Sequence, residues 1–237
     1  MNVSAGKCYR NFSRTKGRDE NDMAIRILTS HFDNGFPQDF SARLKSIINS
    51  REKFVFVASE FYGDPAKTDR YFHLFLNMFS DVGITFVDAR VVVGRMSKEQ
   101  VQKEIVSADV IWLAGGDTVA QYRYFKEFEI IPHIKNTDSV VIGMSAGAIN
   151  MAETAICSIA SGHKSQAFYN ALNLVNISVE PHFDPNNISQ ELLLISQKYP
   201  LVGLCDNSVI IEEKGKYELF GQIFLIKNEK IKPINHI

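Results

Sequence analysis

The sequence of 237 residues predicts an α/β domain built on a mostly parallel sheet, with helices on both faces and antiparallel strands at the C-terminal edge. Three observations predict this class. Short apolar runs alternate with amphipathic stretches of helical period, the pattern of βαβ units. Runs such as Phe54–Ser59 are apolar throughout, as expected of strands covered on both faces. Near the C-terminus, strand-like runs follow one another with only short turns.

The first half of the chain supplies the alternating elements. Strands are expected at Ile25–Ser30, Phe54–Ser59, Ile84–Ala89, Val110–Ala114 and Ser139–Gly143. Helices are expected at Pro37–Asn49, at Lys67–Asp81, after Ser97 and between the fourth and fifth strands. The second helix repeats apolar residues at helical spacing, and Ser97 is an N-cap with Gln100 as its capping-box partner.

The last third changes character. Leu174–Val179 and Leu201–Leu204 are expected to be strands separated by a helix at Ile188–Lys198. Three runs with short turns then predict the antiparallel edge strands Val209–Glu213, Tyr217–Phe220 and Ile223–Ile226. No internal repeat or linker interrupts the chain after Met23, so residues 23–237 are expected to form one domain. Residues 1–22 are polar and basic, and are expected to form a flexible leader.

Composition excludes several classes of function. The formal net charge is -1 and no dense basic cluster lies in the body of the chain, so no nucleic-acid partner is expected. No apolar run reaches the roughly 18–20 residues of a membrane span. The cysteines Cys8, Cys157 and Cys205 are odd in number and lack metal-ligand spacing. We therefore expect free thiols, a cytoplasmic location, and neither a metal nor a cofactor.

The most informative motif is the run Ser139–Gly147, SVVIGMSAG. It places a G-x-S-x-G sequence, centred on Ser145, between an apolar strand and a stretch that can be helical. Glycines two residues on either side of the serine allow the strand and helix to pack closely around a sharp turn. The pattern predicts a nucleophile elbow with Ser145 as the nucleophile; a turn made only of small residues is the alternative.

A second motif, Ala114-Gly115-Gly116-Asp117-Thr118, ends the preceding strand. Adjacent glycines at the carboxyl edge of a sheet can direct backbone N–H groups into the ligand crevice. We expect the N–H groups of Gly116 and Ala146 to form an oxyanion hole. A phosphate-binding turn is the alternative, although the Lys-Ser/Thr of a P-loop is missing. Gly115 and Asp117, together with His163 in a later loop, are candidates for substrate contact.

A serine nucleophile requires a base and a carboxylate that orients the base. His182 follows a predicted strand and is the candidate base, with His31, which also follows a strand, as its rival. Asp206 follows the run Leu201–Cys205 and is the candidate carboxylate. Asp184 and Glu180, which flank His182, remain alternatives.

Together these motifs resemble the aspartyl dipeptidase (dipeptidase E) and cyanophycinase family of serine peptidases. The resemblance covers nearly the whole chain from Ile25 onward. It is carried by AGGDT at 114–118, IGMSAGA at 142–148, ALNLV at 171–175, PHF at 181–183 and VGLCDNS at 202–208.

The resemblance implies a flavodoxin-like sheet related to class I glutamine amidotransferases, and a triad of Ser145, His182 and Asp206. Asp206 stands where dipeptidase E has a glutamate, so the backbone has to compensate for one methylene. In dipeptidase E, an arginine between the histidine and the glutamate helps to hold an N-terminal aspartate. The stretch from Phe183 to Cys205 contains no arginine, so this preference is not expected here.

Three functions follow from these residues. The leading hypothesis is a dipeptidase-like serine exopeptidase that cleaves short peptides through an acyl-enzyme, as a monomer or homodimer. The second is an esterase or amidase on the same scaffold. The third is a catalytically inactive protein that binds a small peptide or metabolite.

Overall fold

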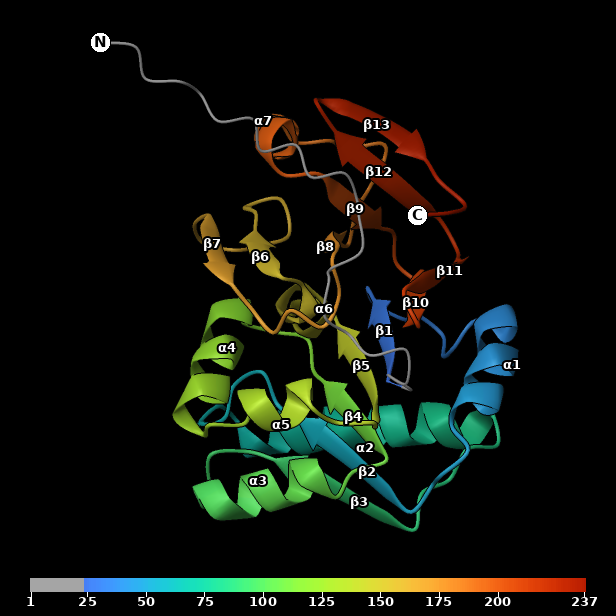
Figure 1. Ribbon diagram of the computed structural model, residues 1–237, viewed down its shortest axis with the longest axis vertical. Helices are drawn as coiled ribbons and strands as arrows, with labels where there is room; N and C mark the ends of the chain where they lie inside the picture. The colour runs from blue at the N-terminus through green and yellow to red at the C-terminus, as the bar shows by residue number, and fades with distance from the viewer. Residues whose placement is uncertain (1–23) are drawn as a thin grey trace.

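The computed structural model describes residues 24–237; the leader predicted at residues 1–22 lies outside this range. Seven of the strands form a large sheet: β1 (Ile25–Thr29), β2 (Lys53–Val57), β3 (Asp88–Val92), β4 (Val110–Leu113), β5 (Val140–Met144), β10 (Val209–Glu213) and β11 (Lys216–Phe220). Their order is β11-β10-β1-β5-β4-β2-β3 (Figure 1).

The first five of these strands are mutually parallel, and β10 and β11 are antiparallel at the edge. This confirms the predicted fold class. The order β3-β2-β4-β5 corresponds to the first four positions of the flavodoxin order 2-1-3-4-5, and β1 occupies the fifth. The strand order therefore reverses between β2 and β4, where the crevice outside the carboxyl ends of the strands is the usual ligand site.

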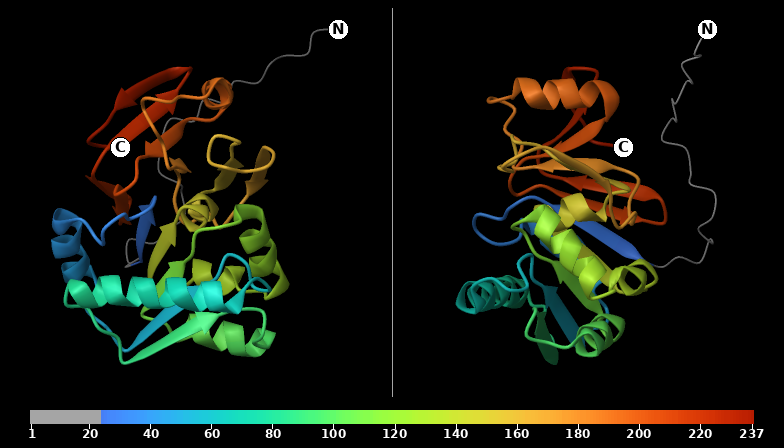
Figure 2. Two further views of the ribbon diagram at one scale, coloured as in Figure 1. Left: turned by 180° about the vertical axis from the view of Figure 1, so that it is seen from behind. Right: turned by 90° about the vertical axis from the view of Figure 1, so that its left-hand side faces the viewer.

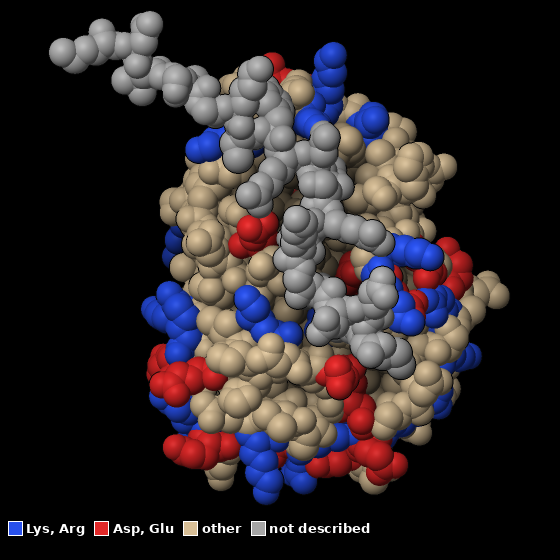
Figure 3. All heavy atoms as spheres, in the orientation of Figure 1, with Lys and Arg blue, Asp and Glu red and all other residues tan. Residues whose placement is uncertain are grey.

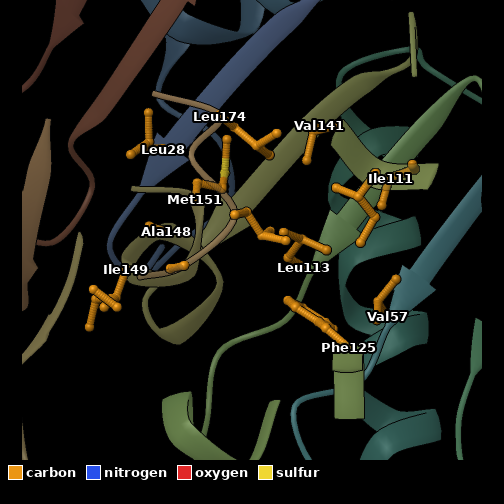
Figure 4. Close-up of a cluster of buried hydrophobic side chains, with 14 of the residues drawn as sticks. Leu28, Val57, Ile111, Leu113, Phe125, Val141, Ala148, Ile149, Met151 and Leu174 are labelled. Carbon is orange, nitrogen blue, oxygen red and sulfur yellow. The ribbon is translucent and has the colours of Figure 1, made fainter. Parts of the chain in front are cut away.

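Helices cover both faces of the sheet. Helices α1 (Gln38–Ile47) and α2 (Pro65–Asp81) pack on one face against an aromatic-rich cluster that includes Phe54, Phe56 and Trp112. The other face is covered by α3 (Lys98–Val106), α4 (Thr118–Glu127), α5 (Ile131–Lys135) and α6 (Ala146–Met151). Figure 2 shows α2 and α3 on opposite sides of the sheet, and Figure 4 shows the mainly aliphatic cluster beneath α6.

A second sheet lies at one end of the molecule with α7 (Gln190–Lys198) (Figure 1). It contains β8 (Ser178–Pro181), β9 (Leu201–Leu204), β12 (Ile223–Lys227) and β13 (Lys230–Pro233), in the order β13-β12-β9-β8. A hairpin of β6 (Thr154–Cys157) and β7 (Ala167–Asn170) accompanies it. The sequence did not predict β6, β7 or β13.

The expectation that Ile223–Ile226 extends the edge of the large sheet was wrong. β12 pairs with β9 instead, because the turn after β11 redirects the chain. Gly221 in that turn has φ of 82°, and the carbonyl of Gln222 accepts hydrogen bonds from the Ser208 hydroxyl and the Cys205 N–H.

Two further strand predictions need correction. The strand expected at Ile84–Ala89 is found at Asp88–Val92, because Ile84 lies in the turn after α2 and is tied to that helix: its N–H donates to the carbonyl of Phe79. The strand expected at Leu174–Val179 begins only at Ser178. Leu174 and Val175 instead donate their N–H groups to the carbonyl of Met151, which ties this segment to the end of α6.

On the face shown in Figure 3, basic and acidic side chains are interspersed rather than gathered into a patch of one sign. None of the helices within residues 24–237 is both long enough and apolar enough to cross a membrane.

Candidate active site

Ser145 occupies the sharp turn between β5 and α6. Its backbone has φ of 49° and ψ of -106°, a conformation that a residue with a side chain adopts only under strain. Its N–H donates to the carbonyl of Thr29 on β1, which fixes the turn to the sheet. The strand–turn–helix context that the sequence predicts is therefore present, and Ser145 stands at the carboxyl edge of the sheet.

The glycines of the motif are required by close packing. A Cβ at Gly143 would lie 2.5 Å from the sulfur of Met151 and 2.7 Å from the backbone of Gly147. A Cβ at Gly147 would lie 2.1 Å from the carbonyl oxygen of Leu113 on β4. The helix thus approaches two neighbouring strands more closely than any side chain would allow.

Ser145, His182 and Asp206 form one hydrogen-bonded chain. The Ser145 Oγ lies 3.0 Å from His182 Nε2, and His182 Nδ1 lies 2.9 Å from Asp206 Oδ1. Because a carboxylate only accepts hydrogen bonds, Nδ1 carries the proton and the neutral ring leaves Nε2 free to accept the Ser145 hydroxyl. His182 itself has φ of 56° and immediately follows β8. A residue of the second sheet thus places its imidazole beside Ser145, which follows β5 of the large sheet.

Ser30, a residue that the sequence analysis did not single out, joins the histidine to the aspartate. Its hydroxyl donates to Asp206 Oδ1 at 2.6 Å and accepts the backbone N–H of His182 at 2.8 Å. Ser30 is fully buried just beyond β1. The available signal was a hydroxyl residue at the end of a predicted strand, but the sequence does not show that its side chain is buried.

The backbone around Asp206 is fixed by hydrogen bonds to residues 29–33. The next residue, Asn207, donates its N–H to the carbonyl of His31 at 2.7 Å and exchanges side-chain hydrogen bonds with Asp33. The Thr29 hydroxyl donates to the carbonyl of Ser208. The loop that carries the carboxylate is thereby held against the end of β1, within reach of the imidazole.

The electrostatics of Asp206 suit an ionised carboxylate. Burial acts to raise the pKa of this carboxyl, but the hydrogen bond from Ser30, the attraction of the His182 ring when it is protonated, and the hydrogen bond of that ring together bring the pKa below its ordinary value. The His31 N–H, 3.2 Å from Oδ1, acts in the same direction. Asp206 is therefore available as an anion to stabilise an imidazolium.

Of the two predicted oxyanion donors, Ala146 follows Ser145 in the chain and Gly116 lines the same cavity as Ser145. Ala146 is the first residue of α6, and no hydrogen bond within residues 24–237 uses its N–H or that of Gly116. Gly116 has φ of 134°, and a Cβ there would lie 2.1 Å from the Ser59 hydroxyl. Only glycine fits this turn.

The three candidate substrate contacts have local structural roles. Gly115 packs beside the elbow, since a Cβ there would lie 3.4 Å from Cβ of Ser145. Asp117 is the N-cap of α4 and accepts the N–H of Ala120. His163 uses both ring nitrogens, with Nδ1 3.0 Å from the Ser158 carbonyl and Nε2 2.8 Å from the Thr118 hydroxyl. Substrate contact by these residues stays a prediction.

The alternative base and acids lie apart from this chain of hydrogen bonds. The ring centroid of His31 is 6.5 Å from that of His182, and its Nε2 faces Asp33. Glu180 is buried and accepts the Ser158 hydroxyl at 2.6 Å. Asp184 accepts the N–H of Asn186. None of these groups is hydrogen-bonded to the His182 ring.

A cavity of about 240 Å³ opens beside Ser145. It lies at the carboxyl ends of β2 and β4, where the strand order reverses, and α2 forms its outer wall. It is lined by His31, Phe56, Ala58, Ser59, Glu60, Asp64, Lys67, Thr68, Tyr71, Phe75, Ala114, Gly115, Gly116, Met144, Ser145 and His182. Within residues 24–237, no group of three or more His, Cys, Asp or Glu side chains could hold a metal ion.

Comparisons with known proteins identify the family of the chain and structures of similar fold. The model of the family described as peptidase family S51 matches residues 29–220. No curated protein matches the chain significantly. Among solved structures, a peptidase from an acI-B1 Actinobacterium is similar with a TM-score of 0.69 and 15% identity, over 90% of this chain and 94% of that one. A peptidase E protein from Listeria monocytogenes EGD-e is similar with a TM-score of 0.62 and 16% identity, over 83% and 98% respectively.

Proposed function

The chain belongs to peptidase family S51 and is a serine peptidase, and from this premise we propose that Ser145, His182 and Asp206 are its catalytic triad. The observation that carries the proposal is the continuous chain of hydrogen bonds from the Ser145 hydroxyl through the imidazole to the Asp206 carboxylate. This series of hydrogen bonds starts at Ser145, in a strained turn in front of a helix, where the serine is accessible to a substrate.

Acylation begins when the Ser145 Oγ attacks the carbonyl carbon of the scissile peptide bond. The hydroxyl proton passes to His182 Nε2, and Asp206 stabilises the imidazolium that results. The N–H groups of Gly116 and Ala146 donate to the tetrahedral oxyanion. The C–N bond then breaks, and His182 returns its proton to the leaving amine.

Deacylation reverses these roles. A water molecule attacks the acyl-enzyme carbonyl and gives its proton to His182 Nε2. The bond between the acyl carbon and Oγ breaks, the carboxylic acid product leaves, and the proton returns to Ser145. The reaction needs no group beyond these side chains, the backbone donors and water.

We propose that the substrates are short peptides cleaved next to their amino terminus. The cavity beside Ser145, at about 240 Å³, is smaller than the roughly 300 Å³ at which drug-sized ligand sites begin. Space of this size supports binding of one residue on that side of the scissile bond. Glu60 and Asp64 line the same cavity and offer carboxylates to a free terminal ammonium.

The experiment is a screen of dipeptides and their amino-acetylated counterparts with the wild-type protein, Ser145→Ala and Ser46→Ala. Removal of a triad serine costs about 10⁶-fold in kcat in the best-studied case, so Ser145→Ala should lose all measurable turnover. Ser46 is exposed on α1 and its variant is the matched control, with full activity expected. Acetylation of the amino terminus should abolish cleavage.

Turnover by Ser145→Ala at a wild-type rate would contradict the proposed triad. Hydrolysis of simple esters with no cleavage of any dipeptide would instead favour the esterase or amidase alternative. Equal cleavage of free and acetylated peptides would contradict the exopeptidase assignment while leaving the triad intact.

We propose a cytoplasmic location and action on small peptides as a monomer or homodimer, without nucleic acid or membrane. Cys157 and Cys205 are both free, which fits a reducing compartment. Fractionation of cells that express a tagged full-length protein tests the location, and light scattering tests the assembly.

A further inference from the structure

We infer that the cavity beside Ser145 is the subsite for the side chain of the acyl residue, and that it selects a large apolar side chain. This inference rests on the proposed function, since it assigns a substrate class to the same site. It concerns the first residue of a short peptide, whose carbonyl carbon is attacked by Ser145.

The floor of the cavity is apolar. Phe56 on β2, Phe75 on α2 and Met144 on β5 are at most 8% exposed and face one another across the aromatic-rich side of the sheet. Ala58 and Ala114, at the ends of β2 and β4, leave the space that larger side chains would fill. An apolar group placed here would leave water and meet carbon or sulfur atoms, which is the favourable direction of the hydrophobic effect.

The position of the cavity points to the acyl side of the scissile bond. Its floor is continuous with Gly115 and Gly116, on the side of the predicted oxyanion donors. The leaving amine must lie at His182 Nε2, because His182 gives it a proton. His182 reaches Ser145 from β8 in the other sheet and lines the cavity where it contacts Ser145, whereas Phe56 and Phe75 line it on the side of β2 and α2. A side chain next to the oxyanion is therefore placed toward β2, β4 and α2.

The charges at this site disfavour an acidic side chain. Glu60 and Asp64 line the cavity together with one cation, Lys67, and none of the three forms an ion pair with another described residue. An acidic side chain of the acyl residue would meet the apolar floor and two like charges. The terminal ammonium of the same residue would instead be attracted to them.

The test compares aminoacyl-coumarin amides whose first residue is Phe, Leu, Ala or Asp. Burial of a large apolar side chain in place of a methyl group should raise kcat/KM by about 10- to 100-fold for Phe or Leu over Ala. The Asp substrate should be the poorest of the four. Each substrate has the same leaving group, so the differences report only the acyl residue.

Two variants test whether this cavity is the cause. Thr68 lines the cavity from α2, so Thr68→Trp should fill it and Thr68→Leu should fill it partly. Both should lower kcat/KM for the Phe substrate, Thr68→Trp by at least about 10-fold, and should lower it by a smaller factor for the Ala substrate. Arg70→Ala, an exposed change on the same helix that does not line the cavity, is the control.

Failure of this inference is distinguishable from failure of the triad. If the Phe and Ala substrates are cleaved equally, or if Thr68→Trp slows both to the same degree while Ser145 still reacts with a small fluorophosphonate, the subsite assignment is overturned. If Ser145 does not react in the folded wild-type protein, the proposed triad itself is contradicted. Selective loss of the Phe substrate in both Thr68 variants would support the assignment.

Discussion

Individual side chains at strand ends determine what this site can do. Ser145 follows β5 and His182 follows β8, whereas Asp206 is held by a loop that is hydrogen-bonded to the end of β1. Ser30 contacts both His182 and Asp206 with a single hydroxyl. We therefore regard Ser30 as a positioning residue for the proposed triad rather than a catalytic residue.

The first prediction concerns Ser30→Ala. Hydrogen bonds to charged groups contribute roughly 1.5–3 kcal/mol, so loss of the hydroxyl should reduce kcat at neutral pH by at least about 10-fold. The pKa of Asp206 should rise, because the Ser30 hydrogen bond helps to lower it. The titration profile of the Asp206 carboxyl, followed by NMR, should thus be displaced to higher pH than in the wild-type protein.

Ser41→Ala is the matched control, because Ser41 is also buried but donates its hydroxyl to the carbonyl of Pro37 at the start of its own helix, α1. It should lower stability without moving the titration profile of Asp206. An unchanged profile for Ser30→Ala, with a loss of stability like that of Ser41→Ala, would show that Ser30 acts only in folding.

At the scale of elements, the turn between β5 and α6 depends on how closely the helix lies to β4. The Leu113 carbonyl leaves no room for a Cβ at Gly147, and Gly143 is equally restricted by Met151. The same packing fixes the direction of α6, whose first N–H group is the predicted oxyanion donor. A change at this turn should therefore alter both the free energy of unfolding of the protein and the position of Ser145 in the site.

The second prediction concerns Gly147→Ala. The added methyl group would have to displace the backbone of Leu113 or shift α6, at a cost of about 1–3 kcal/mol in the free energy of unfolding. Because the shift would move Ser145 relative to His182, kcat should fall by at least about 10². Urea unfolding and steady-state kinetics measure the two effects separately.

Gly83→Ala is its control, since Gly83 has φ of 77° at the end of α2 and nothing lies within 4 Å of an added Cβ. It should also lose stability through backbone strain, but it should retain activity. Equal activity in Gly147→Ala and Gly83→Ala would contradict the coupling of packing to the site.

At the scale of the whole molecule, the central strands and the turn at Ser145 could be predicted from the sequence. The central strands β2, β4 and β5 could be predicted because burial on both faces requires continuous apolar runs. The elbow at Ser145 was predictable because glycine spacing encodes a local turn.

The second sheet was less predictable, since its short strands are defined by their partners rather than by local pattern. β3 was misplaced because the apolar residues at 84–87 lie in the loop between α2 and β3, where Ile84 and Phe86 pack in the same cluster as α2. The sequence analysis also missed Ser30 and the floor of the cavity. A buried serine, Phe56 and Phe75 look the same in a sequence whether they line a functional site or belong only to the core.

The third prediction concerns stability and pH. Burial raises the pKa of Glu180 from its ordinary 4.5 to about 7, against the opposing hydrogen bonds from Ser158 and Ser161, and with a smaller contribution from Glu191. Between these pH values the folded state holds a proton that the unfolded state has lost, so stability falls as pH rises. Above pH 7, the free energy of unfolding is therefore lower by about 3 kcal/mol than it is at acidic pH, where Glu180 is protonated in both states.

Glu180→Gln removes this titration while keeping an oxygen to accept the Ser158 hydroxyl. The free energy of unfolding of the variant and of the wild type is measured in urea at pH 5 and pH 8. Relative to the wild type, the variant should be more stable at pH 8 than at pH 5. A difference that is the same at both pH values would show that Glu180 does not titrate in this range.

The central claim is that Ser145 is a nucleophile activated by His182 and Asp206. The most direct measurement is the intact mass of the wild-type protein, Ser145→Ala and His182→Ala after treatment with a fluorophosphonate. We predict one adduct on the wild type, none on Ser145→Ala, and strongly slowed labelling of His182→Ala. An adduct on Ser145→Ala, or a folded wild-type protein that stays unmodified even with the smallest reagent of the class, would contradict the account.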